Sequence, residues 1–166
     1  INRGIHDERT VSLWFQVDDT ASKKKQVIYE EGGAGRGLNI YVEEDLLYVG
    51  GWNRGQSKWA GDWVESKKVT SDKWHHVALV LDGEETVTNG ALTAYLDGQN
   101  VGEVKGSQLW DHADGIGLGN VNGKTRFKSG VSTGTDNGLA GAVDEFQVFN
   151  SALNSAQIKQ LATSFI

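Results

Sequence analysis

The sequence predicts an all-β protein: a two-sheet antiparallel jelly-roll sandwich with one short C-terminal helix. The main observation is a recurring pattern of short apolar runs bounded by glycine, asparagine and aspartate, which is typical of strands and turns. Several runs also alternate, for example at Val11, Leu13, Phe15 and Val17, whose side chains would share one face of a strand. The chain has 166 residues, which suits a single domain over residues 1–166 with one substantial core.

Nine strands are expected before the helix. In chain order they cover Thr10–Val17, Gln26–Glu31, Leu38–Val42, Leu46–Trp52, Trp74–Leu81, Leu92–Leu96, Gln99–Glu103, Gly115–Asn120 and Ala140–Phe149. Asp97-Gly98 separates two of them at hairpin spacing and supplies the positive φ that a type I′ turn needs. The helix is expected over Ser155–Ala162, because Asn154 can cap it and Gln157 can reach back as in a capping box.

Four histidines invite a metal or catalytic interpretation, which the pattern does not favour. His75 and His76 are neighbours in a strand and therefore face opposite sides of the sheet, so they cannot chelate one ion. We expect one of the two to lie in the core with a hydrogen-bond partner. His6 and His112 are isolated loop residues, and no role is assigned to them.

The composition favours an acidic globular domain. Hydrophobic residues make up 38% and charged residues 23%, and the formal net charge is −6. The basic residues are scattered apart from Lys23-Lys24-Lys25, which reads as a solvated loop, so no nucleic-acid partner is predicted. There is no cysteine and no apolar run long enough to span a membrane. Because the chain starts at Ile1, we expect a piece of a larger multidomain protein.

Three segments form a set when read in order. They are Trp74-His75-His76-Val77-Ala78, Tyr95-Leu96-Asp97-Gly98 and the stretch from Gly138 to Leu153 with Val143-Asp144-Glu145-Phe146 at its centre. This set resembles the laminin-G-like branch of the concanavalin A-like jelly rolls, from Val11 to Leu161. That family includes lectins, adhesion modules, receptor domains and glycosidases, so the resemblance implies a fold more than a function.

Polar residues gather where three expected strands run out into loops. Each loop places carboxylate or amide oxygens beside glycines, and strands that lie side by side would bring these ends to one rim. The predicted ligand-binding residues are Glu31, Trp52, Asn53, Asn120, Asn122 and Arg126. The alternative is turn chemistry, because asparagine, aspartate and glycine are the residues that β-turns use.

The segment Gly51–Thr70 is expected to be a long loop. Trp52, Trp59 and Trp63 lie there among polar residues and glycines, unlike the residues of a core strand. A tryptophan face can stack on the C–H face of a pyranose, and Trp52 is the predicted platform. The alternative is that one or two of these tryptophans pin the loop onto the sandwich. The tryptophans at 14, 74 and 110 are interpreted as structural.

Calcium is the predicted cofactor, because oxygen-rich strand ends suit Ca²⁺. The resemblance implies a structural ion at Asp144, with Asp7 or Glu8 as an N-terminal acid; alternatively, Asp144 satisfies buried backbone donors. The predicted metal ligands are Asp144, Glu31, Asn120 and Asp136. The paired-calcium site of the pentraxin branch is not expected, because Gly35-Arg36-Gly37 stands where that branch has an Asp-Asn pair.

The sequence lacks a catalytic constellation. The resembling laminarinase-type glycosidases carry E-x-D-x-x-E, whereas Glu43-Glu44-Asp45 is followed by Leu46-Leu47-Tyr48 without the second glutamate. There is no cysteine nucleophile and no G-x-S-x-G turn. We therefore expect no enzyme.

The leading interpretation is a carbohydrate-binding, lectin-like module of a secreted or cell-surface protein such as a bacterial adhesin. Its partner would be a glycan or cell-surface polysaccharide, bound with the help of calcium. The alternative is an adhesion or spacer module that contacts protein and has no sugar pocket. A glycosidase-related domain ranks third.

Overall fold

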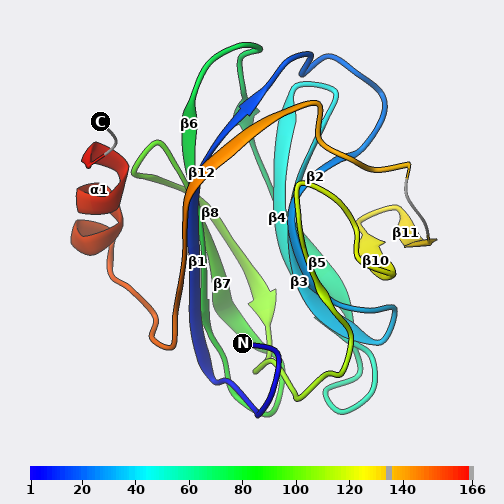
Figure 1. Ribbon diagram of the computed structural model, residues 1–166. Coiled ribbons are helices and arrows are strands. Elements are labelled where there is room, and N and C mark those ends of the chain that lie inside the picture. The colour runs from blue at the N-terminus through cyan, green and yellow to red at the C-terminus, as the bar shows by residue number, and fades with distance from the viewer. Residues whose placement is uncertain (134–135, 165–166) are drawn as a thin grey trace.

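The fold is a sandwich of two five-stranded antiparallel sheets, seen in a computed structural model that describes residues 1–133 and 136–164 (Figure 1). The first sheet has the order β12-β1-β6-β7-β8 and the second β5-β4-β3-β2-β9, while β10 and β11 form a separate hairpin. The elements are β1 (Glu8–Val17), β2 (Gln26–Gly32), β3 (Arg36–Glu43), β4 (Leu46–Asn53), β5 (Trp59–Lys68), β6 (His75–Asp82), β7 (Thr88–Leu96), β8 (Gln99–Gly106), β9 (Ile116–Leu118), β10 (Lys124–Phe127), β11 (Gly130–Thr133), β12 (Gly141–Phe149) and α1 (Ser155–Thr163). The predicted jelly-roll sandwich with one C-terminal helix is confirmed.

The main core fills the space between the sheets. The alternating residues of β1 point into it, and Val11, Leu13, Phe15 and Val17 are at most 1% exposed. Inward side chains of β6, β2, β3 and β4 meet them from both sheets. The period-two pattern of the sequence therefore identified which face of β1 is buried.

The outer face of the first sheet is also covered, because α1 packs on it (Figure 1). Ile158 is fully buried there against Ala78, Val80 and Tyr95. The predicted capping box is present: Asn154 accepts from the Gln157 backbone N–H, and the Gln157 side chain accepts from the Asn154 backbone N–H.

The predicted hairpin turn is present, and both histidines of β6 are buried. Asp97 and Gly98 both have positive φ, 51° and 78°, as a type I′ turn requires. His75 faces the core, where its Nδ1 lies 2.8 Å from Asp97 Oδ2. His76 faces α1, and its Nε2 lies 2.8 Å from Ser12 Oγ. The sequence predicted one buried histidine, and the structure buries both on opposite faces.

The outer face of the second sheet is partly covered by the chain from Asn120 to Gly130, which includes β10 (Figure 1). Val121 and Phe127 pack there on Tyr41, Trp52 and Trp63. Strands β5, β10 and β11 were not expected. The predicted loop Gly51–Thr70 is wrong over most of its length, because β4 extends to Asn53 and Trp59–Lys68 forms β5. In the part of the chain that the structure describes, no helix has the length and apolar character needed to cross a membrane.

Candidate functional site

Two of the three predicted strand ends do lie side by side, but their side chains do not form an open rim. In the register of the second sheet, Trp52 pairs with Gly37 and Glu31 pairs with Leu38. Trp52 is nevertheless only 1% exposed, and its Nε1 donates to Gly33 O at 2.8 Å. Its indole stacks on that of Trp63, with ring centroids 6.1 Å apart. Trp52 therefore offers no open stacking face, which corrects the prediction.

Glycines explain how these indoles fit against the sheet. A Cβ on Gly50 would lie 2.2 Å from Trp63 Cδ1, and one on Gly37 would lie 2.7 Å from Trp52 Cζ2. Trp63 Nε1 also donates to Asn39 Oδ1 at 2.9 Å. The tryptophans are therefore built into the molecule rather than displayed on a loop.

Glu31 lies in a buried charged network, not at the surface. Arg9 Nη1 donates to both of its carboxylate oxygens, at 2.9 and 2.7 Å, and Tyr29 Oη donates to Oε1 at 2.8 Å. His112 Nε2 lies 3.0 Å from Oε2. Burial by itself would raise the pKa of Glu31, but His112 and Arg9 hold it below its usual value. Glu31 is fully buried and hydrogen-bonded by protein side chains, so its carboxylate is not displayed at the surface as predicted.

The remaining predicted ligand residues have mainly structural contacts. Asn53 is buried, and its Oδ1 accepts from Gln56 N at 3.2 Å, as in the turn alternative. Arg126 Nε donates to Ala60 O at 2.8 Å and so ties the β10 segment to the start of β5. Asn120 and Asn122 are exposed in the loop after β9. Of the six predicted residues, these two asparagines remain accessible while the others are wholly or partly engaged.

The predicted calcium ligands do not come together. Asp144 pairs with Trp14 in the β-ladder, whereas Glu8 lies six residues further along β1, roughly 20 Å away at strand spacing. Glu31 faces the core, while Asn120 and Asp136 are exposed side chains in loops. Among the residues that the structure describes, no three His, Cys, Asp or Glu side chains are grouped so as to hold a metal. This ligand set does not fit the ion, although calcium binding itself stays a prediction.

Glu30 points away from the core, under the loop that contains Asn122. Its Oε1 accepts from Asn122 N at 2.8 Å, while Oε2 is buried without a hydrogen-bond partner. Burial raises the pKa of Glu30 to about 7, and the neighbouring carboxylates of Glu31 and Asp114 add to this. The group therefore takes up its proton near neutral pH when the protein is folded.

We expect Glu30 to make the fold less stable as the pH rises. Its pKa is raised from 4.5 to about 7 on folding, so its contribution is complete below pH 4.5 and is lost as the pH rises through 7. The shift corresponds to about 3 kcal/mol of unfolding free energy. Glu30→Gln, which keeps the acceptor for Asn122 N, should therefore exceed the unmodified protein in stability at pH 8 but not at pH 4.5. Urea unfolding of both proteins at the two pH values measures this.

The unfolding free energies of the two proteins are compared as a difference, because His76 changes stability with pH in the opposite direction to Glu30. Burial lowers the pKa of His76 from 6.5 to about 4, so stability falls as the pH drops through that interval. Subtracting the two profiles removes this contribution. Parallel profiles for Glu30→Gln and the unmodified protein would show that Glu30 does not titrate as described.

An open aromatic groove lies on the outer face of the second sheet, beside the segment that covers Trp52. We call it the tyrosine groove; it has a volume of about 350 Å³ and is lined by Tyr41, Glu43, Tyr48, Glu65, Lys128 and Ser129. Tyr41 and Tyr48 are register partners on β3 and β4. Their rings stack at 4.7 Å with an interplanar angle of 3°. Tyr41 is buried beneath Phe127, whereas Tyr48 is only half-buried. Tyr48 thus provides a fixed, accessible aromatic face.

Polar groups surround that face. Lys25 Nζ pairs with Glu43 Oε1 at 2.9 Å, and Lys128 Nζ pairs with Glu65. Tyr41 Oη accepts from Lys128 N at 3.2 Å, which fixes the edge of the groove. Burial, with Glu43 and Glu44, raises the pKa of Tyr48, so its hydroxyl stays protonated and can donate. The groove combines one apolar ring face with carboxylate acceptors and ammonium and hydroxyl donors.

The tyrosine groove was not predicted from the sequence, although a signal was present. Tyr48, Gly50 and Trp52 alternate on β4 and lie on one face, which marks that face as aromatic. Glu65 and Lys128 come from β5 and from the end of β10, two segments that were expected to be loops. Without those strands, the sequence could not bring the groove together.

Comparison with known proteins identifies the family. A sequence model described as the concanavalin A-like lectin/glucanases superfamily, of laminin G type, matches residues 3–159. No curated protein sequence matches the chain. Similar solved structures include a native heptameric SAP-like pentraxin from Limulus polyphemus, 18% identical with a TM-score of 0.66 over 97% of this chain and 72% of that chain.

Two further structures share the fold. A putative carbohydrate-binding protein from Bacteroides ovatus is 20% identical, with a TM-score of 0.62 over 94% of this chain and 41% of that chain. Domain 4 of AbnA, an extracellular arabinanase from Geobacillus stearothermophilus, was solved in complex with arabinotriose; it is 16% identical, with a TM-score of 0.62 over 96% of this chain and 68% of that chain. At these identities the structures show the fold alone. Because the family's sequence model matches nearly the whole chain, the protein belongs to the laminin G-type branch of the concanavalin A-like lectin/glucanases superfamily.

Proposed function

We propose that the protein is a non-catalytic, lectin-like module that binds a glycan in the tyrosine groove. The observation that carries the proposal is the stacked Tyr41–Tyr48 pair, which holds the half-buried Tyr48 ring open to solvent between charged side chains. An aromatic face takes the C–H side of a sugar ring, while the surrounding donors and acceptors take its hydroxyls. Family membership and two carbohydrate-related structural neighbours support the proposal.

The groove also suits binding better than hydrolysis. Glu43 and Glu65 are each engaged with a lysine, at Lys25 and Lys128. Retaining and inverting glycosidases both use a carboxyl group that donates a proton to the leaving group. The ion pairs instead fix the carboxylates as hydrogen-bond acceptors. A secreted or cell-surface parent protein, such as an adhesin, is part of the proposal.

Tyr48→Ala should weaken glycan binding while the protein stays folded. Loss of an aromatic anchor costs about 1–3 kcal/mol of binding, or roughly 5- to 150-fold in affinity. Tyr48→Phe, which keeps the ring, should bind within a few-fold of the unmodified protein. A glycan array identifies the ligand, titration calorimetry measures its affinity for the variants, and thermal melting confirms that each is folded.

The array is run in calcium and in chelator, which also tests the predicted cofactor. A glycan that binds in both conditions would show that calcium is not needed at the groove. If Tyr48→Ala binds normally, the site lies elsewhere on the molecule. If no glycan binds the unmodified protein, the protein-contacting adhesion module becomes the better description.

A further inference from the structure

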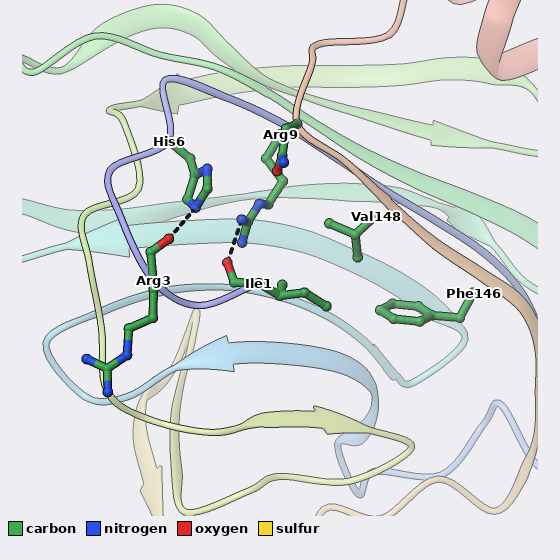
Figure 2. Close-up of a pocket in the computed structure, with 7 residues that line it drawn as sticks. Ile1, Arg3, His6, Arg9, Phe146 and Val148 are labelled. Carbon is green, nitrogen blue, oxygen red and sulfur yellow. Dashed lines mark hydrogen bonds between the residues drawn. The ribbon is translucent and has the colours of Figure 1, made fainter.

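A second cavity lies on a different side of the molecule from the tyrosine groove. It has a volume of about 470 Å³ and opens between the N-terminal segment, residues 1–7, and strand β12 of the first sheet. Figure 2 shows it, lined by Ile1, Arg3, His6, Arg9, Phe146 and Val148, with Asn150 as the seventh lining residue. A volume of this size can hold a compact organic molecule. We call it the N-terminal pocket.

Hydrogen bonds hold the wall of the N-terminal pocket in place. His6 and Leu109 form a reciprocal backbone bridge at 2.8 and 2.9 Å. Gly4 N donates to Asp111 Oδ1, and Asn2 Nδ2 donates to Asp114 O, both at 2.8 Å. The segment is therefore attached at three points to the chain before β9, and the pocket is formed before any ligand arrives.

The Arg9 guanidinium lies at the back of the pocket, where its side chain is buried and ion-paired with Glu31. The Arg9 guanidinium has five N–H donors, of which Nη1 bonds to Glu31 and Nη2 donates to Ile1 O at 2.7 Å. Arg9 Nε is buried with no hydrogen-bond partner. His6 lines the same space, and its Nε2 donates to Arg3 O at 3.0 Å (Figure 2). The unpaired Arg9 donor calls for an acceptor, and an anionic oxygen is the strongest one.

The charges around the pocket also favour an anion. Among the lining residues that the structure describes, none is acidic. Glu31 does not line the pocket, and its carboxylate is already shared by Arg9, Tyr29 and His112. Arg3 points away from the pocket in Figure 2, with Nη1 3.9 Å from Asp111 Oδ2, and can add long-range attraction for an anion.

The opposite wall is apolar. Phe146 and Val148 alternate on β12 and face the pocket from the same side of the strand (Figure 2). Both are half-buried and pack against the main core, so they form a fixed surface. Phe146 is also in ring contact with Tyr29, with centroids 5.6 Å apart. A ligand that fits here needs an anionic end and a partly apolar body.

We propose that the N-terminal pocket binds a compact carboxylic acid, with its carboxylate toward the unpaired Nε of Arg9 and its body on Phe146 and Val148. A sugar acid and a short aliphatic acid share this chemistry, and Asn150 at the edge gives the sugar acid an additional hydrogen-bonding group. The proposal is independent of glycan binding at the tyrosine groove, because the two sites share no residue.

Titration followed by backbone amide NMR tests the proposal at constant ionic strength. The probes are sodium glucuronate, sodium hexanoate and neutral glucose. We expect one or both acids to shift the amides of His6, Val148 and Asn150, while glucose leaves them unchanged. A larger effect of glucuronate identifies a sugar acid as the ligand, and a larger effect of hexanoate identifies an aliphatic acid.

A matched pair of variants separates a local site from general charge effects. Asn150→Asp places a carboxylate at an exposed position of the pocket. Like-charge repulsion should weaken the binding of the acid ligand at least about tenfold. Asn100→Asp makes the same charge change on the exposed β7–β8 hairpin, where an aspartate can still accept from Gly102 N, and should leave binding within about twofold. Equal effects of the two variants, or equal shifts by glucose and the acids, would overturn the proposal.

Discussion

Replacing Glu31 by glutamine should destabilise the protein by about 3–5 kcal/mol, the cost of leaving a buried charge without its partner. Arg9 and Glu31 are both fully buried, and Arg9 has no other anion among its hydrogen-bond partners. Glutamine keeps the shape of the side chain but removes the negative charge. Its amide N–H groups would also face donors, the Arg9 Nη1 and the Tyr29 hydroxyl. Urea denaturation at neutral pH measures the loss.

A surface pair provides the control for this experiment. Glu43 is ion-paired with Lys25 at 2.9 Å, but both side chains are about one-fifth exposed, so Glu43→Gln should cost no more than about 1 kcal/mol. A double variant with Arg9→Met and Glu31→Leu should recover much of the loss, because no charge is then left buried. If Glu31→Gln costs no more than Glu43→Gln, the buried pair is not held as the structure shows.

Local patterns were sufficient for most of the sandwich. The alternation in β1, the Asp97-Gly98 turn and the Asn154 cap each depend on residues close in sequence, and each is present in the structure. In these segments the local preference and the tertiary environment agree, which is the condition under which sequence patterns predict structure.

Strand β5 could not be predicted from its local pattern. Trp59 packs into the main core while Trp63 packs on the outer face, so the strand is buried on both sides and shows no clean alternation. Gly61, with φ +115°, and a register irregularity near Asn53 further disturb the pattern. The polar residues around the tryptophans suggested a loop, but one of them is the hydrogen-bond partner of an indole: Asp62 Oδ2 accepts from Trp59 Nε1 at 3.0 Å. Polar partners of buried indoles look like loop residues in a sequence.

The candidate site required side-chain directions that the sequence does not contain. Strand ends at Glu31 and Trp52 were placed correctly beside each other, yet one side chain faces the core and the other lies under a covering segment. His112 contacts Glu31 although the two residues are 81 positions apart in the sequence, and no local motif predicts that contact. The tyrosine groove similarly depends on β5 and β10 reaching the same face of the sheet. Long-range packing, rather than residue type, decided which groups are accessible.

Trp52→Ala should destabilise the protein by about 3–5 kcal/mol, as expected when a buried tryptophan is truncated. The indole is 1% exposed, stacks on Trp63 and fills the space left open by Gly37. Its removal would leave a cavity beneath the β10 segment and would leave Gly33 O without the Nε1 donor. Equilibrium unfolding of the variant in urea measures the change.

Tyr48→Ala is the matched control, because Tyr48 lies on the same strand and the same face but is only half-buried. It should cost much less stability than Trp52→Ala, since solvent can fill the space that the ring vacates. The two variants therefore separate the roles of the aromatic row on β4: Trp52 supports the covering segment, and Tyr48 provides the binding face. A Trp52→Ala protein that unfolds at the same urea concentration as the unmodified protein, yet no longer binds its glycan, would place the site at the strand ends and refute the tyrosine groove.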